Sequence, residues 1–540
     1  MPLNRLNDLA FFTLILRDRV AVEPYCEQEF WQTCRAFPAV GAACSEYFHA
    51  CLRPMLRRAR FYTVLHLCGF LIIIYSLSML VPALMGLLYG ESDLYAFLKT
   101  FAGAFSCGLL LWGLTSRYRG DLKTRDGFLV VVLFWCVFSS VSALPFWFDQ
   151  RLQLSVTDAL FEGISGITTT GASILDNIDD QPKSILYYRA QLNFLGGLGI
   201  IVLAIAILPM LGIGGAKLYQ GELPGPLKEE RLTPRLADTA KHLWMIYSGL
   251  ALAGTLAFRL AGMDWFDALC HSLSTVSLGG FSTHGDSLGY YHSDAIESVA
   301  GVFSILAAVN FALYFVVLRR RSLLPVLRDA EFRFFALIVT LVVGYTCFSL
   351  YHSGLFNGRE ALVHGFFQAV SVMTDNGLGS AGFPDWSQDT VLLLFGASFF
   401  GGCVGSTCGG IKALRFLILR RQSSHEIRQL IHPGAVYVAK VGGRAISERV
   451  IKSVLGLFFL YIFFTCLFTW ALVVAGNDVM TAFGTVAACI NNMGIGYGAT
   501  AAGFGGLNDV SKWLMCAAML FGRLEIFPLI VVFSRTFWRY

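Results

Sequence analysis

The chain has 540 residues, of which 56% are hydrophobic and only 14% charged, and its formal net charge is +5. An average soluble domain carries about 25% charged residues, so this composition excludes an ordinary soluble protein and places most of the chain in a lipid bilayer. Nucleic-acid binding is not expected, because the sequence has no basic stripe with interleaved aromatic residues.

The first sixty residues precede every apolar stretch long enough to cross a membrane. Their apolar run, Leu9–Leu16, is short and is not followed by a small-residue cleavage site, which disfavours a signal peptide. We expect residues 1–60 to form a cytoplasmic amphipathic cap. A start of the protein at Met55, just before a basic lead-in to the first span, is the alternative.

Ten apolar stretches follow, and each is long enough to cross a hydrocarbon core, which takes about 20 helical residues. The predicted spans lie near residues 61–90, 94–115, 128–148, 190–216, 242–262, 298–318, 334–356, 390–411, 453–476 and 513–534. Ten spans put both termini on one side of the membrane. Because short cytoplasmic loops retain Lys and Arg, the distribution of these residues predicts that both termini are cytoplasmic.

Four connections between spans end in a polar tract that contains a glycine in the same register. The glycines are Gly171, Gly280, Gly377 and Gly494. The residues thirteen positions earlier are Asp158, Asp267, His364 and Thr481. Twelve helical residues rise only about 18 Å, so each segment can enter the membrane but cannot cross it. Non-helical backbone at membrane depth is tolerated only where it lines a protein or water-filled path, so we predict four re-entrant pore helices around a pseudo-fourfold axis.

The predicted fold is therefore an all-α membrane protein with an N-terminal two-helix hairpin and four membrane–pore-loop–membrane repeats in pseudo-fourfold arrangement. The predicted boundaries are an N-terminal cytoplasmic extension at 1–60, a transmembrane hairpin at 61–120, and repeats at 121–216, 217–321, 322–430 and 431–540.

The chemistry that fits four such tracts is cation permeation. A cation that crosses a membrane loses its water shell, and rings of backbone carbonyl oxygens can replace the lost water. Glycine permits the backbone angles that turn carbonyls inward, and the C-terminal ends of half-helices attract cations. The tracts therefore predict a cation pathway without a ring of acidic side chains.

Other classes of function fit the sequence less well. Coupled carriers also have internal repeats and broken helices, but many have inverted pairs where this chain has four parallel repeats. Proton or sodium coupling stays open, with Glu162, Asp158 or Asp375 as proton carriers. An enzyme is not expected, because the sequence has no HExxH motif, no GxSxG motif and no Ser/His/Asp spacing. A regulatory scaffold would not need four aligned tracts.

Motifs that carry a family resemblance run from about residue 60 to the C-terminus. They are Leu144–Phe146, Thr168–Gly171, Gly196–Gly199, Gly225–Lys228, Gly279–His284, Gly401–Lys412, His432–Pro433, Asn491–Gly494 and Phe521–Glu525. On these motifs the chain resembles the Trk/Ktr/HKT superfamily of potassium transporters, and most of all the bacterial TrkH/TrkG potassium uptake proteins. A single TTTG tract is weak support, whereas the whole ordered set is very specific.

The resemblance implies potassium uptake across the bacterial inner membrane through a single carbonyl-lined pore with an intramembrane gating loop. A K⁺ symporter coupled to H⁺ or Na⁺ is the alternative. The resemblance also implies a homodimer with one pore per protomer and a cytoplasmic nucleotide-binding regulatory subunit of the TrkA type. The long basic connections 215–241 and 412–452 are its expected docking surface. K⁺ is the transported ion, and no covalently bound cofactor is implied.

Carried onto this sequence, the family's selectivity filter falls on three residues of each tract. These are Thr169, Thr170 and Gly171; Leu278, Gly279 and Gly280; Asp375, Asn376 and Gly377; and Asn492, Met493 and Gly494. The third tract departs from the commoner Thr-Thr-Gly or Thr-Ala-Gly pattern. Asp375 either raises the local cation concentration or holds the pore helix through hydrogen bonds. We favour the second, because intramembrane carboxylates usually have polar partners.

The family's gating loop falls on a glycine-rich stretch of the third repeat. Its predicted residues are Gly401, Gly402, Gly405, Ser406, Thr407, Cys408, Gly409, Gly410 and Lys412, and relatives tend to have glycine in place of Cys408. Each glycine in a helix costs about 1 kcal/mol relative to alanine, so this stretch is not expected to be a stable lipid-facing helix. A glycine-rich helix contact is the alternative.

Arg523 lies within the last predicted span, where a charge normally faces a cavity or a partner. In relatives the matching arginine projects toward the permeation path. We therefore predict that Arg523 and the loop 401–412 together form the gate. Glu525 is a candidate partner of Arg523, and a structural interhelical arginine is the alternative.

Overall fold

The computed structural model describes residues 61–91, 94–117, 124–207, 236–382, 386–433 and 440–539. The chain divides into two units, Met1–Thr63 and Val64–Tyr540, and the elements that form the candidate site all belong to the second. The expected cap at 1–60, the alternative start at Met55, the Gly225–Lys228 motif and most of the 215–241 connection lie outside the described residues.

Helices make up most of the described structure, as the predicted all-helical membrane fold requires. They are α4 (Leu80–Leu88), α5 (Leu94–Leu114), α6 (Thr124–Phe148), α7 (Val156–Ile167), η1 (Ile178–Asp180), α8 (Lys183–Ile207), α10 (Leu236–Leu260), α11 (Trp265–Ser277), η4 (Ser287–Tyr291), α12 (Asp294–Ala308), α13 (Phe311–Arg320), α14 (Leu324–Arg328), α15 (Ala330–His352), α16 (Gly358–Met373), α17 (Gln388–Ser398), α18 (Ala413–Ile431), α19 (Glu448–Val474), α20 (Val479–Ile490), η6 (Gly498–Thr500), α21 (Asp509–Arg523), α22 (Phe527–Phe533) and α23 (Arg535–Arg539). An antiparallel pair of two-residue strands, β1 (Lys440–Val441) and β2 (Arg444–Ala445), places Lys440 opposite Ala445.

Six helices in the described ranges are long and apolar enough to cross a membrane, and the number rises to eight if each of two bent helix pairs counts as one span. The predicted continuous spans at 298–318 and 513–534 are wrong, because α12 and α13 meet at 90° and α21 and α22 at 110°. In the third repeat α17 ends at Ser398 and α18 begins at Ala413, so the span at 390–411 is interrupted at the glycine-rich stretch that was not expected to form a stable helix. Averaged hydropathy hides such breaks, because a window of about 20 residues is dominated by the apolar residues on either side of the bend.

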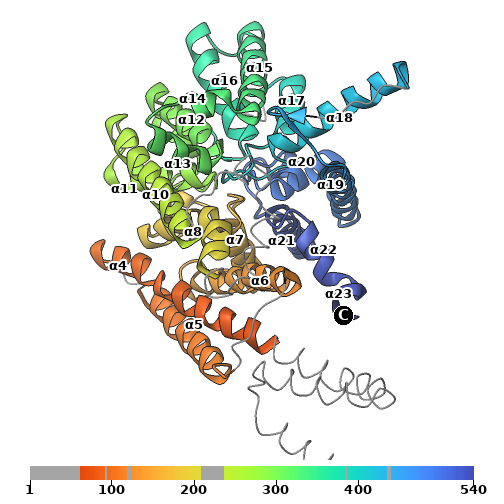
Figure 1. Ribbon diagram of the computed structural model, residues 1–540. Coiled ribbons are helices and arrows are strands. Elements are labelled where there is room, and N and C mark those ends of the chain that lie inside the picture. The colour runs from red at the N-terminus through yellow and green to blue at the C-terminus, as the bar shows by residue number, and fades with distance from the viewer. Residues whose placement is uncertain are drawn as a thin grey trace, which may run out of the picture. The chain divides into compact units, whose positions relative to one another are not determined.

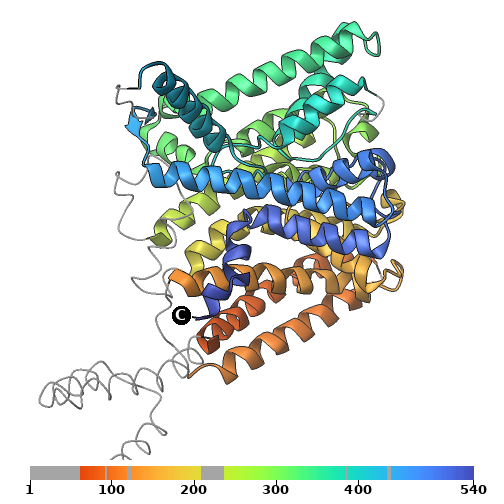
Figure 2. The same cartoon turned by 90° about the vertical axis from the view of Figure 1, so that its right-hand side faces the viewer.

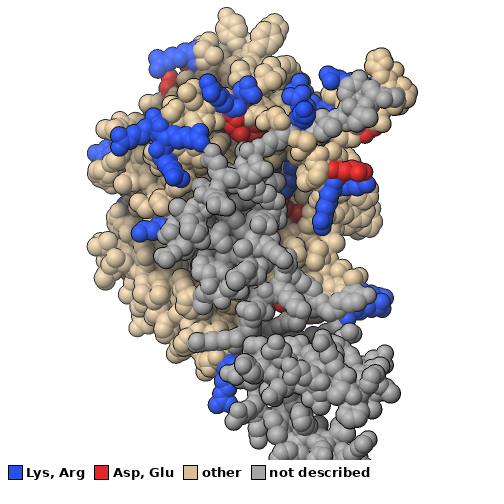
Figure 3. All heavy atoms as spheres, in the orientation of Figure 1, with Lys and Arg blue, Asp and Glu red and all other residues tan. Residues whose placement is uncertain are grey.

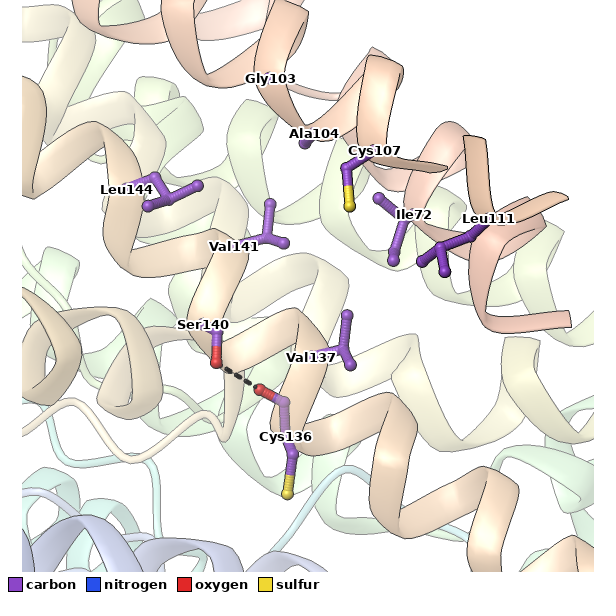
Figure 4. Close-up of a pocket in the computed structure, with 10 residues that line it drawn as sticks. All are labelled: Ile72, Gly103, Ala104, Cys107, Leu111, Cys136, Val137, Ser140, Val141 and Leu144. Atoms are coloured by element: carbon purple, nitrogen blue, oxygen red, sulfur yellow. Dashed lines mark hydrogen bonds between the residues drawn. The ribbon is translucent and has the colours of Figure 1, made fainter. Parts of the chain in front are cut away.

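The first span, Phe61–Leu88, packs against α5 through a pair of glycines. A Cβ placed on Gly69 would lie 3.0 Å from the carbonyl oxygen of Gly108, so the two backbones approach as closely as glycine allows. The first span, α5 and α6 together form an apolar groove, lined by Ile72, Cys107 and Cys136 among others (Figure 4). This hairpin stands beside the four repeats and contributes no residue to the predicted filter or gate.

The rest of the unit consists of four groups of helices, each with an outer helix, a short pore helix and an inner helix or helix pair. The outer helices are α6, α10, α15 and α19, and the pore helices are α7, α11, α16 and α20. The inner elements are α8, α12–α13, α17–α18 and α21–α22. In Figure 1 the groups follow one another in chain order around a common centre, and in Figure 2 their long helices run in roughly one direction.

Contacts between the groups follow one rule. The inner helix of each group contacts the pore helix of the next group, which gives the pairs α8 with α11, α12 with α16, α17 with α20, and α21 with α7. The last pair connects the fourth group to the first, so the arrangement is closed.

Candidate ion pathway

The four pore helices begin with polar caps that fix where each helix starts. In three of them a side chain caps the helix by accepting a hydrogen bond from the backbone N–H of the residue three positions later. The pairs are Ser155 with Asp158, Asp264 with Asp267, and Asp478 with Thr481. Each donor is the residue that lies thirteen positions before the tract glycine. Asn357 caps the longer α16 in a capping box, so His364 lies inside that helix. Such caps satisfy N–H groups that have no partner within the helix.

All four pore helices end in the same backbone turn. After α7, the Thr169 N–H donates to the Gly166 carbonyl at 3.1 Å and the Thr170 N–H donates to the Ser165 carbonyl at 2.8 Å. The equivalent bonds after the other three helices measure 2.8–3.2 Å. This pair of bonds is the Schellman motif, which places the residue after the C-cap in a left-handed conformation.

Each tract has two residues with positive φ in the same positions. The non-glycine residues are Thr169, Leu278, Asp375 and Asn492, with φ of 54°, 54°, 60° and 57°. The glycines two positions later have φ of 82°, 75°, 78° and 82°. A left-handed conformation costs an L-residue roughly 1–2 kcal/mol, so four equivalent cases need surroundings that enforce them. The tracts share this backbone although only the glycine is common to their sequences.

The four tracts form a closed ring. A Cβ added to any tract glycine would collide with the carbonyl oxygen that precedes the glycine of the next tract. The pairs are Gly171 with Gly279, Gly280 with Asn376, Gly377 with Met493, and Gly494 with Thr170. The glycines are partly exposed, whereas the two residues before each of them are buried. The exposed surface of each tract within the ring is therefore glycine backbone, and no other residue fits there.

Polar side chains of the tracts bind surrounding groups and leave the backbone to line the ring. The Asn376 amide nitrogen donates to the Ser304 hydroxyl on α12 at 2.8 Å. The Asn492 amide nitrogen donates to the Thr170 hydroxyl at 2.9 Å and to the Met519 carbonyl on α21 at 3.1 Å. Residues 170 and 492 thus join the first tract directly to the fourth.

Asp375 departs from this pattern. Its side chain is fully buried, and neither carboxylate oxygen has a hydrogen-bond partner among the described residues. The prediction that Asp375 holds the pore helix through hydrogen bonds is therefore wrong. A buried carboxylate without a partner is costly, so these oxygens have to be satisfied by a proton or a cation.

An irregular loop, residues 399–412, separates α17 from α18 and inserts into the break between α12 and α13. The Cys403 N–H donates to the Ala308 carbonyl at 2.9 Å, and the Phe311 N–H donates to the Gly405 carbonyl at 3.1 Å. Gly402 packs against the same Ala308 carbonyl, where a side chain would collide with it. One repeat therefore fills the interruption in the inner element of the preceding repeat.

The same loop lies against the ends of two pore helices. The Thr407 hydroxyl donates to the Val276 carbonyl of α11 at 3.2 Å, and Gly409 touches the Asn491 carbonyl after α20. Two hydrogen bonds within the loop stabilise it. The Ser406 hydroxyl donates to the Cys403 carbonyl, and the Lys412 ammonium donates to the Cys408 carbonyl, both at 2.6 Å. Positive φ values at Gly401, Gly405, Gly410 and Lys412 make the path of the loop incompatible with a helix.

Arg523 ends α21 just before the 110° bend, so the sequence-based placement in mid-span is corrected. Its guanidinium donates to the Gly196 carbonyl at 2.6 Å and to the Thr407 carbonyl at 3.3 Å. It also lies 5.4 Å from the centre of the Trp135 ring. Glu525 is not its partner, because that carboxylate binds Arg415. Arg523 therefore connects the fourth repeat to the first repeat and to the 399–412 loop.

Two of the residues that lie thirteen positions before a tract glycine, Asp158 and His364, contact a residue of another repeat. The Lys512 ammonium lies 2.6 Å from the Asp158 carboxylate, and the His364 imidazole lies 2.8 Å from the Glu297 carboxylate. These contacts join α21 to α7 and α12 to α16. The sequence marked Asp158 and His364 through their register, but it did not indicate their partners.

His284, four residues after Gly280, makes a third contact between repeats. Its two ring nitrogens lie 2.6 Å from Asp179 in the first repeat and 3.2 Å from Asp267 on α11, and its ring stacks on Tyr290. Burial would lower the pKa of His284, but the bonds to both carboxylates outweigh it and raise the pKa above the ordinary value. Burial would raise the pKa of Asp179, but the His284 side chain and the Gly285 N–H lower it below the ordinary value.

This contact predicts that stability depends on pH. Because the pKa of His284 is raised, its contribution to the free energy of unfolding is complete below about pH 6.5 and is lost as the pH rises through the pKa of the folded state. Because the pKa of Asp179 is lowered, its contribution is present above about pH 4 and is lost as the pH falls through the pKa of the folded state. Because both side chains are partly exposed, the total is at most about 1 kcal/mol. We expect the unfolding temperature to fall by about 1 °C between about pH 6 and pH 8, and His284→Asn to reduce this fall. His292→Asn, at a neighbouring exposed histidine, should retain it, and an equal fall in both variants would contradict the assignment.

Comparison with known proteins gives matches over nearly the whole described chain. The TrkH family model, described as a cation transport protein, matches residues 94–540. The Trk system potassium uptake protein TrkG of Escherichia coli K12 is 54% identical over 476 residues, which cover 88% of this chain and 98% of that protein. The Trk system potassium uptake protein TrkH of Vibrio parahaemolyticus is 45% identical over 486 residues, covering 89% and 100% of the two chains. A crystal structure of the potassium transporter TrkH from Vibrio parahaemolyticus superposes with a TM-score of 0.81 at 43% identity, covering 89% of this chain and all of that one.

Proposed function

Because the chain belongs to the TrkH family of cation transport proteins, we propose that it takes up potassium across a bacterial inner membrane and that it is a transporter, not an enzyme. The observation that supports this most is the closed ring of four tracts with glycine backbone on its exposed surface. A ring of backbone carbonyls can replace the water shell of a potassium ion. The filter consists of the three residues at the end of each tract, from Thr169–Gly171 to Asn492–Gly494.

The gate in this proposal is the loop 399–412 together with Arg523. The loop lies directly against the ends of α11 and α20, and Arg523 holds it through the Thr407 carbonyl. A fixed positive charge at this point opposes the passage of cations electrostatically. A change that moves Arg523 would release the loop from α8 and α21 at once.

The orientation and partners follow from the distribution of charge and from the relatives. Lys and Arg outnumber Asp and Glu among the coloured residues on the face shown in Figure 3, which supports a cytoplasmic face there, and we propose that both termini are cytoplasmic. The relatives are named as members of a Trk system, which supports a cytoplasmic regulatory subunit of the TrkA type. We propose that this subunit docks on the basic connections 215–241 and 412–452 and that the protein is a homodimer.

Coupling to a proton or sodium gradient is the second candidate, and Asp375 favours it. Of the three carboxylates that the sequence offered as proton carriers, Glu162 is bound to Arg189 and Asp158 to Lys512. Only Asp375 has no partner among the described residues, so it is the one free to bind a proton or cation during transport.

Ion flux into liposomes that contain the purified full-length protein tests both candidates. We expect passive, mutually competing entry of K⁺ and Rb⁺ with much slower entry of Na⁺. If entry of K⁺ requires an imposed proton or sodium gradient, and Asp375→Asn removes that requirement, the coupled carrier is correct. If no cation enters even when a TrkA-type subunit and its nucleotide are supplied, potassium transport by this chain is refuted.

A further inference from the structure

Beside the first two tracts lies a buried ion pair that the proposed pathway does not use. Arg189 of α8 and Glu162 of α7 are 2.8 Å apart from Nε to Oε1, and their side chains are 1% and 0% exposed. Removing two charges from water is expensive, and a buried pair persists only when further hydrogen bonds satisfy both groups. The remaining bonds of this pair all go to the segments that follow the tracts.

Glu162 holds the chain after the first tract. Its carboxylate accepts hydrogen bonds from the Ser173 hydroxyl at 3.0 Å and from the Ile174 N–H at 3.0 Å. Arg189 donates to the same Ser173 hydroxyl at 3.0 Å. Because Ser173 is two residues after Gly171, these bonds fix the position at which the chain leaves the ring.

Arg189 also holds the chain after the second tract. Its Nη1 donates to the Ser282 carbonyl at 2.9 Å, and its guanidinium lies 4.2 Å from the centre of the Phe281 ring. Phe281 and Ser282 directly follow Gly280. A single planar guanidinium therefore connects the exits of two neighbouring tracts, through several donors in fixed directions.

Among the described residues, no arginine joins the exits of two tracts in the other repeats, and the second and third exits are joined by a bond from the Leu288 N–H to the Gly379 carbonyl at 2.9 Å. The residues nine positions before the tract glycines are all polar and fully buried: Glu162, His271, Gln368 and Thr485. The residues two positions after the glycines are Ser173, Ser282, Gly379 and Gly496. His271 binds the Ser282 hydroxyl at 3.0 Å, so the first two repeats both have this side-chain bond. In the third repeat neither amide atom of Gln368 has a partner among the described residues.

We propose that Arg189, held by Glu162, is a positioning residue for ion selection. It fixes the distance between the first and second tracts and so prevents the carbonyl ring from contracting around an ion smaller than K⁺. This inference rests on the proposed function, since it assigns to Arg189 the selectivity of that same ring.

The test compares Arg189→Lys with the wild type in proteoliposomes and measures the ratio of Na⁺ to K⁺ entry. Lysine keeps the charge but lacks the guanidinium fork, so it cannot bind Glu162, Ser173 and Ser282 together. We expect the ratio to rise about tenfold, with K⁺ entry retained. The double variant Glu162→Gln/Arg189→Gln, which leaves no unpaired charge in the interior, should show the same rise and serves if Arg189→Lys does not fold.

Lys512→Gln is the matched control, because it breaks a different ion pair, which joins α21 to α7, without touching a residue that follows a tract glycine. It should lower the unfolding temperature and leave the Na⁺ to K⁺ ratio unchanged. If the wild type discriminates between the ions and both Arg189 variants discriminate equally well, Arg189 is only structural and the inference is overturned. If the wild type itself does not prefer K⁺, the proposed function fails and the inference fails with it.

Discussion

Gly377→Ala is expected to reduce K⁺ entry at least about 100-fold and to lower the unfolding temperature. Gly377 has a φ of 78°, which costs alanine roughly 1–2 kcal/mol, and its Cβ would collide with the Met493 carbonyl of the fourth tract. The collision displaces the oxygen that completes the ring between the third and fourth tracts. A loss of about 2.7 kcal/mol in the transport step corresponds to a 100-fold decrease in rate.

Gly379→Ala is the matched control for this prediction. It lies two residues further along the same segment, its φ is not in the left-handed region, and nothing lies within 4 Å of an added Cβ. Entry of ⁸⁶Rb⁺ into proteoliposomes, with the thermal unfolding of each variant, separates a local effect from misfolding. Transport by Gly377→Ala at the rate of Gly379→Ala would exclude the third tract from the pathway.

Arg523→Gln is expected to raise K⁺ entry about tenfold in the absence of any regulatory subunit. The substitution removes a positive charge and both bonds that hold the Thr407 and Gly196 carbonyls. Each bond to a charged group contributes about 1.5–3 kcal/mol, so the unfolding temperature should fall at the same time. Flux is measured in proteoliposomes of the isolated protein, where we expect the proposed gate to limit entry through the wild type.

Arg523→Lys separates charge from hydrogen bonding, because lysine keeps the charge and cannot bind both carbonyls with fixed geometry. We expect intermediate flux. Lys452→Gln, which breaks an exposed pair with Glu448, controls for the loss of a surface charge and should transport like the wild type. Lower stability with unchanged flux in both Arg523 variants would leave this arginine with a purely interhelical role.

The register of the four glycines was predictable from the sequence, because each tract glycine has to fit a position with positive φ against a neighbouring backbone. The all-helical fold was predictable for a similar reason, since lipid leaves helices as the only way for a single apolar segment to satisfy its backbone. In both cases a local pattern is dictated by a local physical requirement.

Contacts between distant residues were not predictable in the same way. Arg523 binds Gly196, 327 residues earlier in the chain, and no spacing rule connects them. Arg189 was not singled out at all, because the predicted span at 190–216 begins one residue after it, whereas the helix α8 begins at Lys183. Asp375 was assigned hydrogen bonds on the usual behaviour of buried carboxylates, and the structure shows no partner for either carboxylate oxygen among the described residues.

The contact of α21 with α7, and the bond from residue 492 to residue 170, have a consequence for how the protein is made. The chain is synthesised from its N-terminus, so the first tract is made before the fourth tract, to which it binds and which follows more than three hundred residues later. Until the last repeat is inserted, the ring stays open and has one of its sides missing. A polypeptide that lacks its last repeat therefore cannot form the closed ring of four tracts.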